Sequence, residues 1–353
     1  MAAYTTIDDP SAFFKCQLYT GNGSANHAIT FDDTDTDMQP DLVWIKNRDA
    51  TDSHCLFDSV RGATKLLVVD TNAAEVTDTD TLDSFASDGF QVDADDKVNT
   101  NTEKYVAWCW KAGTTSGITT DGNTTITPSS YSFNQTSGFS VLVYTGNTTS
   151  AAQVAHGLGA TPEVFVVKRR TSTAGFLNYR KVMGGGGYSQ WNVTTQPTGG
   201  SNTWAWNDTD PNSVNIVLGS SVDVNTTDSA GMVAWCFVPK QGFSKFGKYE
   251  GNGNADGTFV YTGFRPAFVQ TMSIDSTSSW QMFDNKREGY NVDNDALVSE
   301  ATTAEVTTDY IDLLSNGFKF RTTGDPNVAE TYMYMAFAEA PFVNSEGVPC
   351  NAR

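Results

Sequence analysis

The stretch Tyr19-Thr20-Gly21-Asn22-Gly23 decides how the chain is divided, because close relatives of it return twice. They are Tyr144-Thr145-Gly146-Asn147 and Tyr249-Glu250-Gly251-Asn252-Gly253, which places the tyrosines 125 and 105 residues apart. A repeat of this length has the size of a small domain and is longer than a solenoid repeat. The sequence therefore predicts three tandem units.

Two further markers follow each of these tyrosines in the same order. The first is a proline that leads an apolar run, at Pro40, Pro162 and Pro266. The second is an aromatic run, at Tyr105–Trp110, Met232–Phe237 and Tyr334–Ala338. Aligning the first and third of these aromatic runs places Trp108 at the position of Phe337.

The first and third units also share a charged block that the second unit lacks. Phe57-Asp58 with Arg61 in the first unit corresponds to Phe283-Asp284 with Arg287 in the third. A charge pair repeated in duplicated units is expected to lock a local turn, and binding of a ligand is the alternative.

The markers predict where each part of the chain begins and ends. Residues 114–137 are rich in Ser, Thr, Gly and Asn, which is typical of a linker or a weakly paired edge region. Neither terminal segment can bury much apolar surface alone, so we expect residues 1–12 or residues 343–353 to form the attachment segment. The predicted parts are an N-terminal arm (1–12), a first unit (13–113), a linker (114–137), a second unit (138–241), a third unit (242–342) and a C-terminal tail (343–353).

The apolar runs have the character of strands. They are rich in β-branched and aromatic residues, they are bounded by turn-forming residues, and helical periodicity is nearly absent. Tyr105–Trp110 is apolar on both faces, which indicates a central strand covered on both sides. The expected fold class is all-β, with three tandem β-sandwich or jelly-roll domains. Trp44, Trp108 and Trp235 are expected inside them.

Composition narrows the classes of function. The chain has 22 basic and 41 acidic residues and a net charge of −19, which repels nucleic-acid phosphates and anionic lipid headgroups. No run of about 18 apolar residues exists, so membrane insertion is not expected. Three histidines and five cysteines fit no metal-ligand spacing, and we predict no metal and no cofactor. Cys109 and Cys236 occupy the same motif position, which indicates a buried apolar slot.

The sequence contains no catalytic motif. It lacks a G-x-S-x-G elbow, a phosphate-binding glycine-lysine loop and an H-E-x-x-H sequence. We therefore expect no catalytic residues and no enzyme activity.

The second unit departs from the repeat between Gly184 and Pro211, where large aromatic residues are concentrated. Trp204 and Trp206 are two residues apart, so on an extended strand both rings would face one way. Aromatic rings can cover the C–H faces of a sugar while carboxylates and amides bind its hydroxyls. The alternatives are that the rings cover the unit's own core or contact another subunit. The candidate glycan or subunit site comprises Tyr188, Trp191, Trp204, Trp206, Asn207 and Asp208.

Several phrases of the chain resemble a family of repeated domains in virion proteins of tailed phages, especially marine phages. The phrases are Tyr19–Gly23, Pro40–Arg48, Phe57–Gly62 and Tyr105–Trp110, together with the opening Met1–Pro10 and the closing unit Tyr249–Phe342. The resemblance implies a structural protein of the tail-fibre type with lectin-like β-sandwich units. It supplies no catalytic residues.

The function expected from this resemblance is that of a fibre, spike or appendage subunit on the virion surface, assembled in the host cytoplasm. Its partners would be other virion proteins, further copies of the chain, with a trimer favoured, and a host surface glycan. One alternative is a capsid decoration protein without a ligand. A glycan depolymerase is the other.

Overall fold

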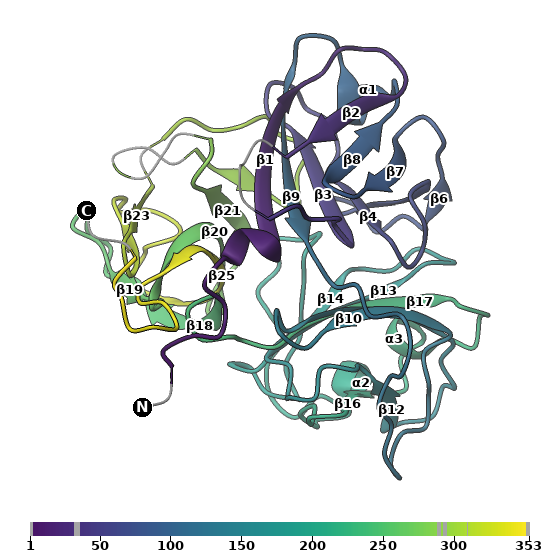
Figure 1. The fold of residues 1–353 in the computed structure, drawn as a ribbon. Coiled ribbons are helices and arrows are strands. Elements are labelled where there is room, and N and C mark those ends of the chain that lie inside the picture. The colour runs from purple at the N-terminus through teal and green to yellow at the C-terminus, as the bar shows by residue number, and fades with distance from the viewer. Residues whose placement is uncertain (1–2, 32–35, 288–290, 292–294, 309, 351–353) are drawn as a thin grey trace.

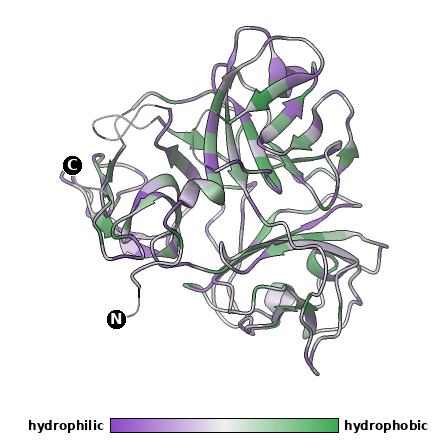
Figure 2. Ribbon diagram, in the orientation of Figure 1, coloured by the Kyte–Doolittle hydropathy of each residue, from purple (hydrophilic) through white to green (hydrophobic). Residues whose placement is uncertain are grey.

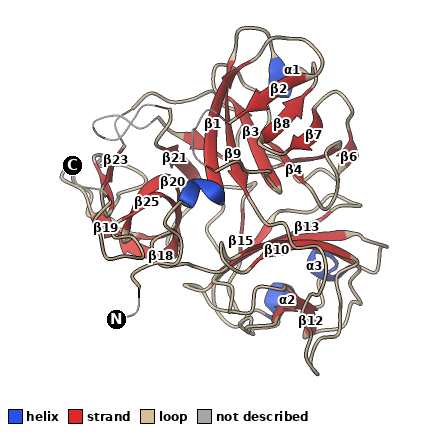
Figure 3. Ribbon diagram, in the orientation of Figure 1, coloured by secondary structure: helices blue, strands red, loops and turns tan. Residues whose placement is uncertain are grey.

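The computed structural model describes residues 3–31, 36–287, 291, 295–308 and 310–350. Strands dominate these ranges, and each of the three α-helices is four residues long (Figure 3). They are α1 (Asp96–Asn99), α2 (Thr203–Trp206) and α3 (Val222–Asn225). The predicted all-β fold class is confirmed.

The first unit holds a six-stranded sheet and a three-stranded sheet. The main sheet has the order β1-β9-β3-β4-β5-β6, and the smaller sheet has the order β2-β8-β7. The strands are β1 (Phe14–Thr20), β2 (His27–Thr30), β3 (Leu42–Asn47), β4 (Cys55–Asp58), β5 (Lys65–Val68), β6 (Val76–Thr77), β7 (Leu82–Ala86), β8 (Gly89–Val92) and β9 (Lys104–Trp110).

The second unit repeats this plan with one more strand at its first edge. The main sheet has the order β10-β11-β17-β13-β14-β15, and β12 pairs with β16 in the smaller sheet. The strands are β10 (Ser130–Asn134), β11 (Phe139–Tyr144), β12 (Ala152–Ala155), β13 (Val164–Arg169), β14 (Leu177–Arg180), β15 (Ser189–Gln190), β16 (Asn215–Leu218) and β17 (Met232–Phe237).

The third unit has a five-stranded main sheet, β18-β25-β20-β21-β22, and a three-stranded sheet, β19-β24-β23. The strands are β18 (Ser244–Glu250), β19 (Phe259–Tyr261), β20 (Phe264–Ser273), β21 (Gln281–Asp284), β22 (Leu297–Val298), β23 (Ile311–Leu314), β24 (Gly317–Phe320) and β25 (Thr331–Pro341). Every sheet is formed by strands of a single unit.

The strand register shows which positions of the units are equivalent. In the β1–β9 pair Tyr19 lies opposite Tyr105, and in the β18–β25 pair Tyr249 lies opposite Tyr332. In both cases the two rings stack, with centroids 5.0 and 5.2 Å apart. The tyrosine that opens each of these two units therefore anchors the same strand pair.

Counting from these tyrosine pairs corrects one expected alignment. Met335 takes the place of Trp108, and Phe337 takes the place of Trp110. The expected match of Trp108 with Phe337 is wrong by two residues. Because side chains of a strand alternate with a period of two, a shift of two keeps the pattern of buried positions and cannot be detected from it.

The two faces of each central strand contribute to different cores, as expected for strands covered on both sides. One face of β9 packs between the two sheets of the first unit, and the other face packs in a core shared with the second and third units. The side chains on the first face are Tyr105, Ala107 and Cys109, and those on the second are Val106, Trp108 and Trp110. Trp44, Trp108 and Trp235 are all buried, as predicted.

The shared core closes the three units into a ring (Figure 1). Three equivalent rings meet at its centre, Trp110 from the first unit, Phe237 from the second and Phe337 from the third. The centroids lie 6.4 Å apart for Trp110–Phe237, 5.5 Å for Trp110–Phe337 and 5.9 Å for Phe237–Phe337. Because three equivalent residues contact one another here, a pseudo-threefold axis passes through this point. Figure 2 shows hydrophobic residues along the strands of all three lobes.

The buried surface agrees with a single packed body. The chain exposes 12,476 Å², somewhat less than the roughly 14,000 Å² expected for a compact monomer of this mass. Three units joined only by linkers would expose more, because their inner faces would remain in water.

The predicted linker is partly wrong. Within residues 114–137, strand β10 pairs with β11 along its whole length and extends the main sheet of the second unit. Thr114 also bridges to Phe133. The alternation of Tyr131 and Phe133 with serine and asparagine was the strand signal, and the polar composition of the segment obscured it.

The N-terminal arm packs on the third unit of its own chain. The hydroxyl of Tyr4 donates to the carbonyl of Gly263 at 2.8 Å, that of Thr5 donates to the carbonyl of Gln241 at 2.7 Å, and Ile7 is buried. The 3-10 helix η1 (Pro10–Ala12) then contacts β1 and β25. Burial of apolar surface by this segment was not expected from the sequence.

The two terminal segments meet. Both the backbone amide and the hydroxyl of Ser345 donate to the carboxylate of Asp8. The tail also closes a small turn through a bridge between Val343 and Pro349, and Val348 on it is exposed. The arm and the tail therefore lie together beside the third unit (Figure 1).

Candidate functional site

The predicted aromatic site of the second unit does not form one surface. Trp204 and Trp206 lie on helix α2, so they do not share a face as they would on a strand. Trp206 is fully buried in the core of the second unit, with its ring 4.7 Å from that of Phe165. For Trp206 the alternative that the ring covers the unit's own core is confirmed. The predicted strand at Trp204 and Trp206 was wrong because these residues form a helix. Asn202 caps this helix, which is only four residues long and therefore leaves no helical pattern in the sequence.

Trp191 lies where all three units meet. Its ring is 5.1 Å from that of Trp44 in the first unit, and its carbonyl accepts a hydrogen bond from Ser299 of the third unit at 2.9 Å. Only 3% of Trp191 is exposed. The rest of the same chain thus covers Trp191, so this ring is not available to a sugar or to another subunit.

One exposed ring, Trp204, and one half-buried ring, Tyr188, remain from the predicted site. Tyr188 and Trp204 pack against each other with centroids 5.3 Å apart, and Trp204 is 38% exposed. Asn207 follows Trp204 by one helical turn, in a left-handed conformation, and its side-chain oxygen accepts a hydrogen bond from Ser150 at 2.5 Å. Asp208 is exposed beside it. The structure thus packs the rings of Tyr188 and Trp204 together, whereas Trp191 and Trp206 are buried elsewhere.

The repeated charge pairs are buried and lie between units. Asp58 and Arg61 form an ion pair of 2.5 Å, and Asp284 and Arg287 form one of 2.6 Å, with no exposure of any of the four side chains. Each aspartate also accepts the backbone amide of its arginine. The expected local turn is confirmed.

Each of these aspartates receives a second donor from the neighbouring unit. The indole nitrogen of Trp235 in the second unit donates to Asp58 at 3.2 Å, and that of Trp108 in the first unit donates to Asp284 at 3.1 Å. Trp108 and Trp235 occupy equivalent positions on β9 and β17. The same hydrogen bond therefore joins the second unit to the first and the first to the third.

A glutamate and a second arginine extend both contacts. Glu75 binds Arg61 of its own unit and Arg170 of the second unit, at 3.0 and 2.8 Å. Glu305 likewise binds Arg287 and, across the interface, Arg48, at 2.9 and 2.7 Å. We call each set of aspartate, tryptophan, glutamate and two arginines an interface lock.

The locks change the ionisation of their acids. Burial alone would raise the pKa of Asp284, but the charge and hydrogen bond of Arg287 outweigh it and hold the pKa below its ordinary value. Burial also opposes ionisation of Glu305 and Glu75, and the arginines beside each of them lower the pKa in the same way. All three carboxylates are therefore charged at neutral pH.

The interface between the second and third units lacks a lock. Arg180 stands where the other units have aspartate, and Met183 stands where they have arginine. Arg180 is 2% exposed, and one of its nitrogens donates to Gln270 of the third unit at 3.2 Å. Its Nε and Nη1 have no hydrogen-bond partner among the described residues. Its guanidinium lies 5.2 Å from the ring of Trp280. Burial lowers the pKa of Arg180 to about 9.

The sequence analysis did not predict that Arg48 and Arg170 bind a glutamate of another unit. A signal for them exists, because Arg48 and Arg170 both follow the leading proline of their unit by eight residues. The third unit has Ile274 at that position, in agreement with its missing lock. The glutamates that these arginines bind are also repeated, since Glu75 and Glu305 each lie between an alanine and a valine.

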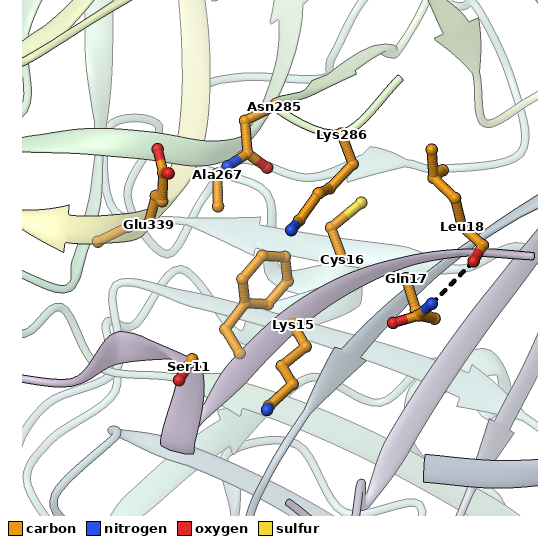
Figure 4. A pocket seen from close by; sticks show the side chains of 11 residues that line it. Ser11, Lys15, Cys16, Gln17, Leu18, Ala267, Asn285, Lys286 and Glu339 are labelled. Carbon is orange, nitrogen blue, oxygen red and sulfur yellow. Dashed lines mark hydrogen bonds between the residues drawn. The ribbon is translucent and has the colours of Figure 1, made fainter. Parts of the chain in front are cut away.

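Two cavities lie at equivalent interfaces. The first has a volume of about 320 Å³ and lies between β1 of the first unit and, in the third unit, β20, β25 and the turn that follows β21 (Figure 4). Its walls include Cys16, Asn285 and Lys286. Burial raises the pKa of Cys16, so the thiol is protonated at neutral pH and is not an activated nucleophile.

The second cavity, also of about 320 Å³, lies between β13 and β14 of the second unit and β18 of the third. Apolar side chains line part of it, and Glu163 and Lys181 form an ion pair of 2.6 Å beside them. It is lined by Glu163, Val164, Arg180, Lys181, Val182, Phe246, Gly247 and Tyr334.

The histidines and the repeated cysteines have structural partners. Nδ1 of the buried His54 accepts the indole N–H of Trp44 at 2.9 Å. His156 accepts the amide of Leu158 within its own turn, as expected, and its Nε2 lies 3.1 Å from the carbonyl of the distant Asn212. Burial lowers the pKa of His156 to about 4. Cys109 and Cys236 are buried in the cores of their units, which confirms the predicted apolar slot. Among the described residues, no group of three or more His, Cys, Asp or Glu side chains could hold a metal ion.

The chain belongs to the family described as a domain of unknown function (DUF7483), which matches residues 9–341. The match spans all three units. No curated protein matches the chain. No solved structure matches it. In the part of the chain that is described, no helix is long and apolar enough to cross a membrane.

The locks predict how stability depends on pH. A carboxylate whose pKa is lower in the folded state stabilises the protein above its unfolded pKa, about 4, and this contribution is lost as pH falls through the folded pKa. Asp284→Asn should lower the free energy of unfolding at pH 7 by about 3–5 kcal/mol, because Arg287 is left without its buried counter-charge. It should also reduce the further loss of stability between about pH 5 and pH 3.

Urea unfolding measured at several pH values checks both effects. Asp37→Asn is the matched control, because Asp37 is exposed. If Asp284→Asn and Asp37→Asn behave alike, the lock does not stabilise the interface.

Proposed function

We propose that the chain is a non-enzymatic structural subunit of a phage virion, a surface fibre, spike or appendage that attaches through its terminal segments. The observation that carries the proposal is the use of its buried charged groups, because the two locks bind one unit to the next. Buried ion pairs of this kind fix the orientation of packed parts. The family resemblance of the sequence supports the same role.

The placement of the termini supports one attachment region. The arm and the tail are joined through Asp8 and Ser345 beside the third unit, and Val348 of the tail is 53% exposed. An exposed apolar side chain on a short terminal turn is suited to contact with another protein. A capsid decoration protein would use the same region on the head lattice, and a trimer of chains stays a prediction in either case.

Removal of residues 344–353 tests the attachment region. The truncated chain should unfold at the wild-type temperature, because the tail buries little apolar surface, yet it should be absent from purified particles. Val222→Ser removes an equally exposed valine from α3 and should leave incorporation unchanged.

Quantitative mass spectrometry of purified virions measures both variants. Normal incorporation of the truncated chain would contradict the attachment role. Absence of the full-length chain from particles would contradict the virion assignment itself.

Contact with a host glycan is the second part of the proposal, and the exposed ring of Trp204, packed on the half-buried Tyr188, favours it. A ring stacked on a sugar contributes about 1 kcal/mol, so Trp204→Ala should weaken binding of host surface polysaccharide about fivefold. The matched control is Phe259→Ala, which removes an exposed ring from β19 in the third unit. Equal polysaccharide binding by the wild type and both variants in glycan-array or titration experiments would remove the glycan role.

A further inference from the structure

A buried arginine lacks a counter-charge at the interface between the second and third units. In each interface lock a buried aspartate is paired with an arginine, as Asp284 is with Arg287. Arg180 stands at the position of that aspartate and is 2% exposed. Burial lowers the pKa of Arg180 to about 9, and no carboxylate of the described residues counters this effect. The guanidinium is therefore charged at neutral pH, in a place where an unpaired charge is strongly destabilising.

The polar groups left over beside this charge are all hydrogen-bond donors. Nη2 of Arg180 donates to the side-chain oxygen of Gln270 at 3.2 Å, so the two side chains touch. Nε and Nη1 of Arg180 and Nε2 of Gln270 have no hydrogen-bond partner within the described ranges. A guanidinium contains no acceptor, and the oxygen of Gln270 is already used. Unused donors around a positive charge are complementary to an anion.

Arg180 also lines the second cavity, which has a volume of about 320 Å³. Val164, Val182 and Phe246 give this cavity apolar walls. Pockets of this size with apolar walls and a few polar groups are typical sites for small organic molecules. A water molecule takes up only about 30 Å³ of liquid, so a single water or inorganic ion would leave most of the cavity empty. The cavity therefore fits an anion that carries an apolar body.

The other two charges at the cavity already bind each other. Lys181 and Glu163 form an ion pair of 2.6 Å, and the side chain of Lys181 is 60% exposed. Lys181 is therefore not the group that an anion needs. Glu163 adds a negative charge to the lining, and like charges repel across a binding site. A ligand with one negative charge is thus favoured over a dianion such as sulfate.

From the unpaired guanidinium and the cavity beside it, we propose that the interface between the second and third units binds a small organic monocarboxylate. The carboxylate of the ligand accepts the free N–H groups of Arg180 and Gln270, and its apolar body lies against Val182 and Phe246. The ligand supplies to this interface the carboxylate that an aspartate supplies to each lock. The inference rests on the buried charge and is independent of the virion assignment.

Benzoate and benzamide are matched probes of the site, because they share the apolar ring and differ in charge. Isothermal titration calorimetry on the full-length protein measures both affinities. We expect benzoate to bind at least about tenfold more tightly, since hydrogen bonds to a charged group are the stronger ones. Sulfate at equal ionic strength should not displace benzoate. Benzoate should also raise the unfolding temperature, because it binds the folded state.

Two variants show which charge holds the ligand. Arg180→Met should abolish the preference for benzoate over benzamide, and it should stay folded because it removes an unpaired buried charge. The double change Glu163→Gln and Lys181→Met removes both charges of the exposed ion pair and leaves the net charge unchanged. This control should keep the preference. The comparison of benzoate with benzamide on the wild type does not depend on the folding of either variant.

Four results would overturn the proposal. Without saturable binding of benzoate, the free donors of Arg180 are satisfied by water alone. Equal binding of benzamide would make the cavity an apolar pocket without an anion site. Undiminished binding of benzoate by Arg180→Met would place the ligand elsewhere, and displacement of benzoate by sulfate would exclude selection of a monocarboxylate.

Discussion

The ring depends on a buried carboxylate that binds an arginine of its own unit and an indole of the next. Trp108 reaches Asp284 and Trp235 reaches Asp58 with the same geometry. The shared core of aromatic side chains supplies most of the burial, but hydrophobic burial has no direction and does not by itself fix how three sheets are turned toward one another. A buried charge has to meet its partners, so it excludes other packings at a cost of several kcal/mol. The locks thus give the pseudo-threefold arrangement its specificity.

The third interface is held by different means. Arg180 replaces the aspartate, and it packs on Trp280 and Gln270 of the third unit. The indole nitrogen of Trp280 in turn donates to the carbonyl of Gln190 at 2.7 Å. This interface also contains the second cavity, which Arg180 and Phe246 help to line. The three interfaces therefore follow one plan but are not held by the same contacts.

Much of the fold could be predicted because strand faces and turn residues are local features. The repeats of Tyr19, the burial of Trp44 and the two-sided strand Tyr105–Trp110 all follow from patterns a few residues long. The closed ring could not be predicted, because contacts such as Arg48 with Glu305 join residues 257 positions apart and leave no local pattern. The prediction that the aromatic residues of the second unit form one site was partly wrong for a similar reason. The spacing of Trp204 and Trp206 predicted that their rings share one face, but the two residues lie on a helical turn. Trp191 was expected in the same site, but Trp44 of the first unit covers it.

Native-state hydrogen exchange on Trp235→Ala tests most directly whether the three units form one cooperative body. Trp235 belongs to the second unit, and its loss should cost about 3–5 kcal/mol, as truncation of a large buried aromatic does. If the ring is cooperative, the slowest amides of β9, β17 and β25 share one free energy of opening, and the change lowers all three equally. Loss of protection in β17 alone, with β9 and β25 unchanged, would contradict a closed ring and leave three independent domains.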